Sequence, residues 1–209
     1  MTAVPPSYFD SLKERICDDL VARGYSIQPG ALAEPLRQAL RAELLDRAEE
    51  MSRAGIGRGG DRQLAREVRS DSTLWLDGSS PAQERYLALM GELRLHLNRG
   101  LYLGLNDFEG HFAHYGPGHF YQKHRDAFRG QSNRLVSAVT YLNDYWPQGA
   151  GGELVLYDET GEERELARIS PEPGTLVVFL SEGFPHEVLT AGDDRYSIAG
   201  WFRRDGGPL

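Results

Sequence analysis

Two histidines and one aspartate in the second half of the chain have the types and spacing of a metal site. His124 and Asp126 are two residues apart, so on an extended strand their side chains would project from one face. His186 begins a later apolar run and could meet them from another strand. Two imidazoles and one carboxylate leave coordination positions open, as in non-haem iron(II) oxygenases. Since H-x-D tripeptides also arise by chance, this pattern needs further support.

Arg195 supplies a second element of such a site. It lies nine residues after His186, at the start of the last apolar run, and Ser197 shares its face of the expected strand. A guanidinium pairs with a carboxylate through two parallel hydrogen bonds, and a buried arginine without a partner is costly. We therefore expect Arg195 to bind an anion, which is either a ligand or a carboxylate of the chain such as Asp193 or Asp194.

Helices are expected in the first half of the chain. Apolar residues recur at intervals of three or four in Ser7–Arg23, Ala31–Ser52 and Pro81–Arg99. The stretch Ala54–Val68 instead combines four glycines with charges and few large apolar groups, so we predict a mobile loop there. Long loops of this kind often carry function.

The sequence of the second half has the pattern of short strands separated by turn residues. Strands are expected at Phe108–Tyr115, Arg134–Leu142, Glu153–Tyr157, Arg164–Ile169, Thr175–Leu180, Glu187–Thr190 and Arg195–Phe202. This recurrence is typical of an all-β barrel or jelly roll. We predict a mainly β fold with supporting α, in which N-terminal helices brace a double-stranded β-helix (jelly-roll) core from outside.

Composition excludes several classes of protein. Lys and Arg total 23 and Asp and Glu total 31, and the net charge of −8 disfavours attraction to a nucleic-acid backbone. Cys17 is the single cysteine, so it can form neither an internal disulfide nor a multi-cysteine metal site, and we expect it to be buried. The chain has neither a signal-like N-terminus nor an apolar stretch of ~18 residues, so we expect a cytoplasmic protein and no membrane partner.

Five motifs, in order, carry a family resemblance. They are HYGPGHFYQKHRD (114–126), RLVSAVTYLNDYW (134–146), GGELVLY (151–157), PHEV (185–188) and RYSIAGWF (195–202). The run from His111 to Asp205 resembles the prolyl 4-hydroxylase group of 2-oxoglutarate dioxygenases, including the oxygen-sensing prolyl hydroxylases and their bacterial relatives. RSDSTLWL (69–76) is similar to the family segment that follows a flexible substrate-covering loop, which would be Ala54–Val68.

The resemblance implies a set of roles for residues of this chain. Iron(II) would be held by His124, Asp126 and His186, and the distal carboxylate of 2-oxoglutarate by Arg195 and Tyr141. The resemblance places Tyr115 in the pocket near the metal, and we group Ser197 with it as cofactor-binding. Substrate contacts are implied for Arg134, Trp201 and Trp75. The expected cofactors are Fe(II), 2-oxoglutarate and O2, with ascorbate as an optional reductant.

Each of the aromatic residues also has a plainer interpretation. On β-strands, Tyr115, Tyr141 and Trp201 are more often core residues than ligand contacts, and we expect Tyr121 and Tyr196 to serve packing. The remaining histidines have no matching ligand role and are expected to be surface or hydrogen-bonded polar residues; they are His96, His111, His114 and His119.

The resemblance implies a single dioxygenase domain over 1–209, with helical support and a covering loop in 1–100 and the catalytic jelly-roll core in 101–209. The leading hypothesis is a protein prolyl 4-hydroxylase, and bacterial relatives point to elongation factor Tu as its partner. Other hypotheses are hydroxylation of a free amino acid or other small molecule, oxidative repair of nucleic acid, which the negative charge disfavours, and a non-catalytic jelly-roll binding or sensing module.

Overall fold

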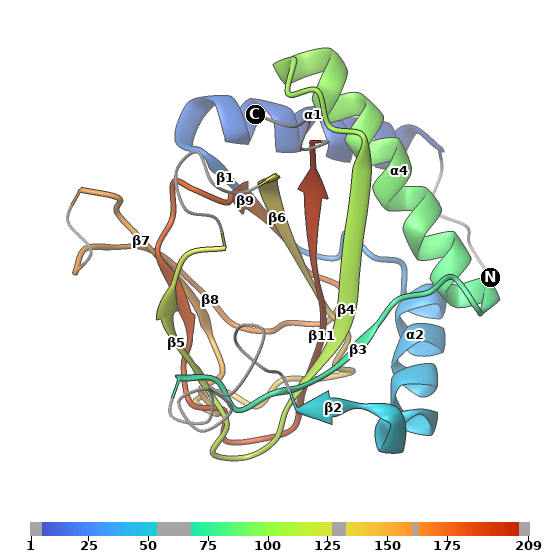
Figure 1. Cartoon of the computed structure of the whole chain (residues 1–209), viewed down its shortest axis with the longest axis vertical. Helices are drawn as coiled ribbons and strands as arrows, with labels where there is room; N and C mark the ends of the chain where they lie inside the picture. The colour runs from blue at the N-terminus through green and yellow to red at the C-terminus, as the bar shows by residue number, and fades with distance from the viewer. Residues whose placement is uncertain (1–5, 54–67, 127–132, 161–162, 205–209) are drawn as a thin grey trace.

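The computed structural model describes residues 6–53, 68–126, 133–160 and 163–204 (Figure 1). Its described helices are α1 (Pro6–Arg23), α2 (Glu34–Asp46), α4 (Pro81–Leu101) and the short 3-10 helix η1 (Ala48–Glu50). The second predicted helix ends early, because α2 closes at Asp46 and the chain tightens into η1. Ser80 caps α4 by accepting a hydrogen bond from the Gln83 backbone N–H at 3.1 Å.

Seven of the eight strands described in the second half lie where the sequence predicts them, within a few residues. They are β4 (Asp107–Tyr115), β5 (Tyr121–His124), β6 (Arg134–Tyr141), β7 (Leu154–Tyr157), β8 (Glu165–Ile169), β9 (Leu176–Leu180), β10 (His186–Val188) and β11 (Arg195–Arg203). The first half adds three short strands, β1 (Tyr25–Gln28), β2 (Ser52–Arg53) and β3 (Ser72–Trp75). The predicted strands did not include these three or β5, because segments of two to four residues show little alternation by themselves.

The strands form two antiparallel sheets. The larger has the order β1-β9-β6-β11-β4-β3-β2 and the smaller has the order β5-β10-β7-β8. The expected jelly roll is therefore present as two facing sheets and not as a closed barrel. The N-terminal part is not purely helical, because β1, β2 and β3 complete the larger sheet.

Alternation along the strands of the larger sheet separates two cores. On β11, Ile198 and Phe202 pack on the helix side, together with side chains from α1, α2 and α4. The helices accordingly lie along one side of this sheet (Figure 1). Residues on the opposite face of β11, namely Arg195, Ser197 and Trp201, face the space between the sheets, where a second apolar cluster also lies. A period of two thus directs polar residues of central strands into the interior.

Two other expectations concern the first half. Cys17 is buried, as predicted. The predicted loop Ala54–Val68 lies outside the described residues except for Val68. Among the helices that the structure describes, none is long and apolar enough to cross a membrane.

Candidate active site

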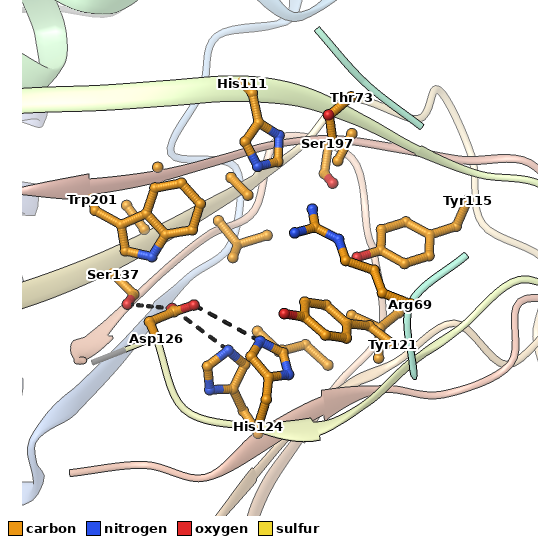
Figure 2. Close-up of a pocket in the computed structure, with 18 of the residues that line it drawn as sticks. Arg69, Thr73, His111, Tyr115, Tyr121, His124, Asp126, Ser137, Ser197 and Trp201 are labelled. Carbon is orange, nitrogen blue, oxygen red and sulfur yellow. Dashed lines mark hydrogen bonds and ion pairs between the residues drawn. The ribbon is translucent and has the colours of Figure 1, made fainter. Parts of the chain in front are cut away.

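His124, Asp126 and His186 converge between the two sheets. One potential ligand atom from each lies within 4.8 Å of the others. The Nε2 atoms of His124 and His186 are 3.8 and 3.6 Å from the Asp126 carboxylate (Figure 2). The two histidines come from paired strands, because His124 at the end of β5 is opposite His186 at the start of β10.

Hydrogen bonds fix which nitrogen of each imidazole is available. His124 Nδ1 lies 2.8 Å from the Gln122 carbonyl, and His186 Nδ1 lies 3.0 Å from the Phe184 carbonyl. A carbonyl only accepts, so both Nδ1 atoms carry a proton, and Nε2 is the nitrogen of each ring that is left to bind a metal. Burial, followed by repulsion from His186, lowers the pKa of His124 to about 3. The imidazole is therefore neutral, as metal ligation requires.

The carboxylate is held in its ionised form. Burial alone would raise the pKa of Asp126, but charge interactions with His186 and His124 and the hydrogen bond from Ser137 lower it. Ser137 Oγ donates to Asp126 Oδ2 at 2.6 Å and lies 2.9 Å from Ser181 Oγ. Two imidazoles beside one carboxylate fit a divalent cation.

The geometry behind this convergence differs from the expectation. The prediction that His124 and Asp126 share one strand face is wrong, because β5 ends at His124 and Asp126 lies in the bend that follows. The chain turns away after its pairing with β10, and Ser137 on β6 then holds the carboxylate.

Arg195 lies in the same cavity as a buried cation. It is 2% exposed, and its side chain donates to the Gly152 carbonyl at 2.9 Å and to Ser197 Oγ at 3.1 Å. No carboxylate of the described residues pairs with it; Asp194, one of the suggested partners, instead contacts His114 at 2.7 Å. The guanidinium carbon is 4.9 Å from the ring centre of Tyr141.

Tyr141 adds an unused hydrogen-bonding group to this end of the site. The side chain is fully buried, and its Oη has no hydrogen-bond partner among the described residues. A buried cation without a carboxylate, next to a buried hydroxyl without a partner, is the environment that an anionic ligand would complete. The donor set thus fits the distal carboxylate of a dicarboxylic co-substrate.

The two histidines, Asp126 and Arg195 share a cavity of about 390 Å³. Nine of the ten predicted site residues line it: Trp75, Tyr115, His124, Asp126, Arg134, His186, Arg195, Ser197 and Trp201. Tyr141 does not line it but is in contact range of Arg195. The residues predicted from the sequence thus come together from six strands and one bend around one cavity. Their individual roles stay predictions.

One wall of the cavity is aromatic. Trp75 meets His111 edge to face with ring centres 5.2 Å apart, and His111 lies 5.5 Å from Trp201. Arg134 covers the Trp201 ring at 3.6 Å and pairs with Glu109 at 2.8 Å. Because Trp75 is 51% exposed, this wall extends from the interior to the surface.

Several cavity residues were not predicted as site residues. His111 is 3% exposed, with Nδ1 bonded to the Phe112 carbonyl at 3.0 Å, so it is a satisfied polar residue inside the site and not a surface residue. Tyr121, expected to serve packing, lines the cavity, as does Arg69 (Figure 2). The spacing of Arg69, Thr73 and Trp75 could have indicated Arg69, because odd-numbered residues of this segment share one face and all three line the cavity.

The sequence profile of the 2OG-Fe(II) oxygenase superfamily matches residues 110–203. Among curated proteins, the chain is 31% identical to human "Egl nine homolog 1" over 146 residues, and 30% identical to the rat protein of that name. These alignments cover 66% of this chain but only 34% of the human and 42% of the rat protein. The chain thus spans about a third to two-fifths of the length of these relatives.

Solved structures match nearly the whole chain. A Pseudomonas putida prolyl-4-hydroxylase is 45% identical, with a TM-score of 0.83, and the alignment covers 93% of this chain and 100% of that one. A Trichoplax adhaerens prolyl hydroxylase, in complex with a hypoxia-inducible-factor peptide fragment, is 24% identical with a TM-score of 0.81, covers 94% and 91% of the two chains, and shows the shared fold. The chain belongs to the prolyl 4-hydroxylase family of the 2OG-Fe(II) oxygenase superfamily.

Proposed function

We propose that this protein is an Fe(II)- and 2-oxoglutarate-dependent prolyl 4-hydroxylase. The observation that carries the proposal is the presence of two sites in one cavity. His124, Asp126 and His186 form a set of two imidazoles and one carboxylate for a dication, and Arg195 lies in the same cavity without a carboxylate partner among the described residues. A binding module would need neither an open metal site nor a second anion site beside it.

The division of roles follows from the donor types. His124 and His186 would bind the metal through Nε2, and Asp126 through its carboxylate. Arg195 and Tyr141 would hold the distal carboxylate of 2-oxoglutarate, with Ser197 orienting Arg195 and Tyr115 facing the co-substrate. When bound, Fe(II), 2-oxoglutarate and O2 supply the oxidising chemistry.

The aromatic wall suits a proline side chain. A pyrrolidine ring is apolar and rigid, and it can pack on Trp201 while the peptide backbone follows the exposed Trp75. Arg134, held over Trp201, would keep the indole in place and contact the peptide. The 45% identity to a bacterial prolyl-4-hydroxylase supports this substrate class.

We further propose that the target is a prolyl residue of elongation factor Tu and that the protein acts in the cytoplasm. We also propose that residues 1–209 act as one domain. The last point is supported by β1, β2 and β3, which complete the same sheet as β4 and β11.

The test combines turnover with substrate identification. The full chain is incubated with Fe(II), 2-oxoglutarate, O2 and ascorbate, with and without purified elongation factor Tu. Succinate formation and a gain of one oxygen atom on a prolyl residue, located by mass spectrometry, are expected. His186→Ala should abolish both, and His114→Ala, a histidine outside the metal set, should not. Succinate without a modified proline would direct the search to small-molecule substrates, and absence of both would contradict the proposal.

A further inference from the structure

Tyr121 makes an unusually close ring contact with His124. The two ring centres are 3.5 Å apart and the planes are inclined by only 14°, so the phenol lies flat on the imidazole. The contact is with a predicted metal ligand and within the cavity. Stacking of this kind restricts rotation of a ring about its side-chain bonds.

Arg69 in turn fixes Tyr121. Its guanidinium carbon lies 4.7 Å from the centre of the Tyr121 ring. Two hydrogen bonds to Asp71, one of them of 2.8 Å, hold the guanidinium in place, and the Asp71 side chain is fully buried. Figure 2 shows Arg69 extending into the cavity beside Tyr121. The result is a chain of contacts from Asp71 through Arg69 and Tyr121 to His124.

The backbone around this chain of contacts is also tied together. Arg69 and Tyr121 form a β-bridge, and the Ser70 backbone N–H donates to the Phe120 carbonyl at 3.1 Å. The Phe120 N–H donates to Ser70 Oγ at 2.8 Å. The segment before β3 is thereby docked on β5, so the stack on His124 depends on a contact between distant parts of the sequence.

The charges of the stack suit a metal site. An unpaired guanidinium next to His124 would repel a dication, but Asp71 pairs with Arg69 through both carboxylate oxygens. The stack therefore gives the imidazole rigidity without adding net positive charge.

We propose that Arg69 and Tyr121 are positioning residues that hold the His124 ring in its metal-binding orientation. The inference rests on the proposed metal site. Of the two histidines, His124 has the greater need of such support, since it ends β5 and its side chain is 16% exposed, against 7% for His186.

The chain contains a second stack of arginine, tyrosine and histidine outside the proposed metal site, which serves as a matched control. Arg41 lies 5.3 Å over the ring of Tyr196, which stacks on His114 with centres 4.8 Å apart and an inclination of 16°. This second stack has the same three residue types, but His114 is outside the metal set.

The test measures binding of Co(II) alone to the metal-free full chain, by calorimetry and by the visible absorption of the bound ion. Without co-substrate or peptide, a direct role of Arg69 or Tyr121 in holding those ligands cannot contribute. Tyr121→Leu should weaken Co(II) binding roughly tenfold and alter the absorption spectrum, because a misoriented ligand changes the metal geometry. Tyr121→Phe should retain both properties, and Arg69→Ala should weaken binding about threefold or more.

The control substitutions Tyr196→Leu and Arg41→Ala should leave Co(II) affinity and spectrum as in the wild type, even where they lower the melting temperature. Tyr121→Leu and Arg69→Ala binding Co(II) within twofold of wild type, with unchanged spectra, would overturn the inference. If Tyr121→Leu does not fold, Arg69→Ala against Arg41→Ala decides alone. Failure of the wild type to bind Co(II) or Fe(II) would instead overturn the proposed metal site itself.

Discussion

Arg195 lines the cavity and contacts Tyr141 behind it, with the guanidinium carbon 4.9 Å from the tyrosine ring centre. Arg195 has no carboxylate partner among the described residues, and the Tyr141 hydroxyl has no hydrogen-bond partner among them. Both residues lie beside the metal set, in the same interior space between the sheets. A ligand that chelates a metal at one end and carries a carboxylate at the other would fit this arrangement.

Removal of the guanidinium should therefore weaken co-substrate binding more than metal binding. Charge-assisted hydrogen bonds contribute ~1.5–3 kcal/mol, so Arg195→Ala should raise the dissociation constant for 2-oxoglutarate by roughly 10- to 100-fold. Calorimetric titration of the anaerobic Fe(II)-loaded protein would measure this change. Tyr141→Phe should have a smaller effect of about fivefold, since it removes one neutral donor.

The control for this experiment is Arg41→Ala, which removes a cation stacked on a different tyrosine, Tyr196. It should leave the dissociation constant for 2-oxoglutarate unchanged. An Arg195→Ala protein that is folded and still binds 2-oxoglutarate with wild-type affinity would show that Arg195 is structural.

Ser137 should affect metal binding because its hydrogen bond helps to keep Asp126 ionised. Its hydrogen bond is one of the contacts that lower the pKa of Asp126, so Ser137→Ala should raise that pKa. A carboxyl group with a lowered pKa stays ionised down to that lowered pKa. The stability it contributes is complete above its ordinary pKa and is lost as pH falls toward the lowered one. Co(II) affinity of Ser137→Ala should therefore fall about tenfold, with the deficit widening as pH is lowered. Equal affinity–pH curves for the two proteins would contradict this role.

His111 should make the metal-free protein sensitive to mild acid. Burial, followed by repulsion from Arg69, lowers the pKa of His111 to about 4. The unfolded chain binds the proton at its ordinary pKa near ~6.5, so protonation favours unfolding. The stability associated with neutral His111 is thus complete above pH ~6.5 and is lost as pH falls toward 4, by up to about 3 kcal/mol.

Replacement with an apolar residue of similar size, His111→Met, should flatten this part of the stability curve. Urea unfolding at a series of pH values would measure the difference in slope between the two proteins. The same slope in both would mean that the imidazole can be protonated in the folded state at little cost.

The sequence indicated which residues gather in the cavity better than it indicated how they are held there, for physical reasons. Arg195 and Ser197 lie two residues apart at the start of a long strand, so their shared face could be inferred. The position of Asp126 depends on a bend after β5 and on a hydrogen bond from Ser137, neither of which has a periodic signature. Tyr121 was assigned to packing because its contact with Arg69 joins segments that only the folded chain brings together.

Trp75 should affect the peptide substrate without affecting the rest of the site. Because its side chain is 51% exposed, truncation should cost little stability, whereas exposed aromatic residues beside a pocket often dominate recognition. Trp75→Ala should raise the KM for a prolyl peptide by roughly tenfold and leave the slow turnover of 2-oxoglutarate without peptide unchanged. Tyr145→Ala is the matched control, since Tyr145 is 70% exposed and does not line this cavity. If both substitutions raise KM equally, or neither does, the peptide does not follow the wall formed by Trp75, His111 and Trp201, and the substrate must enter the cavity from another side.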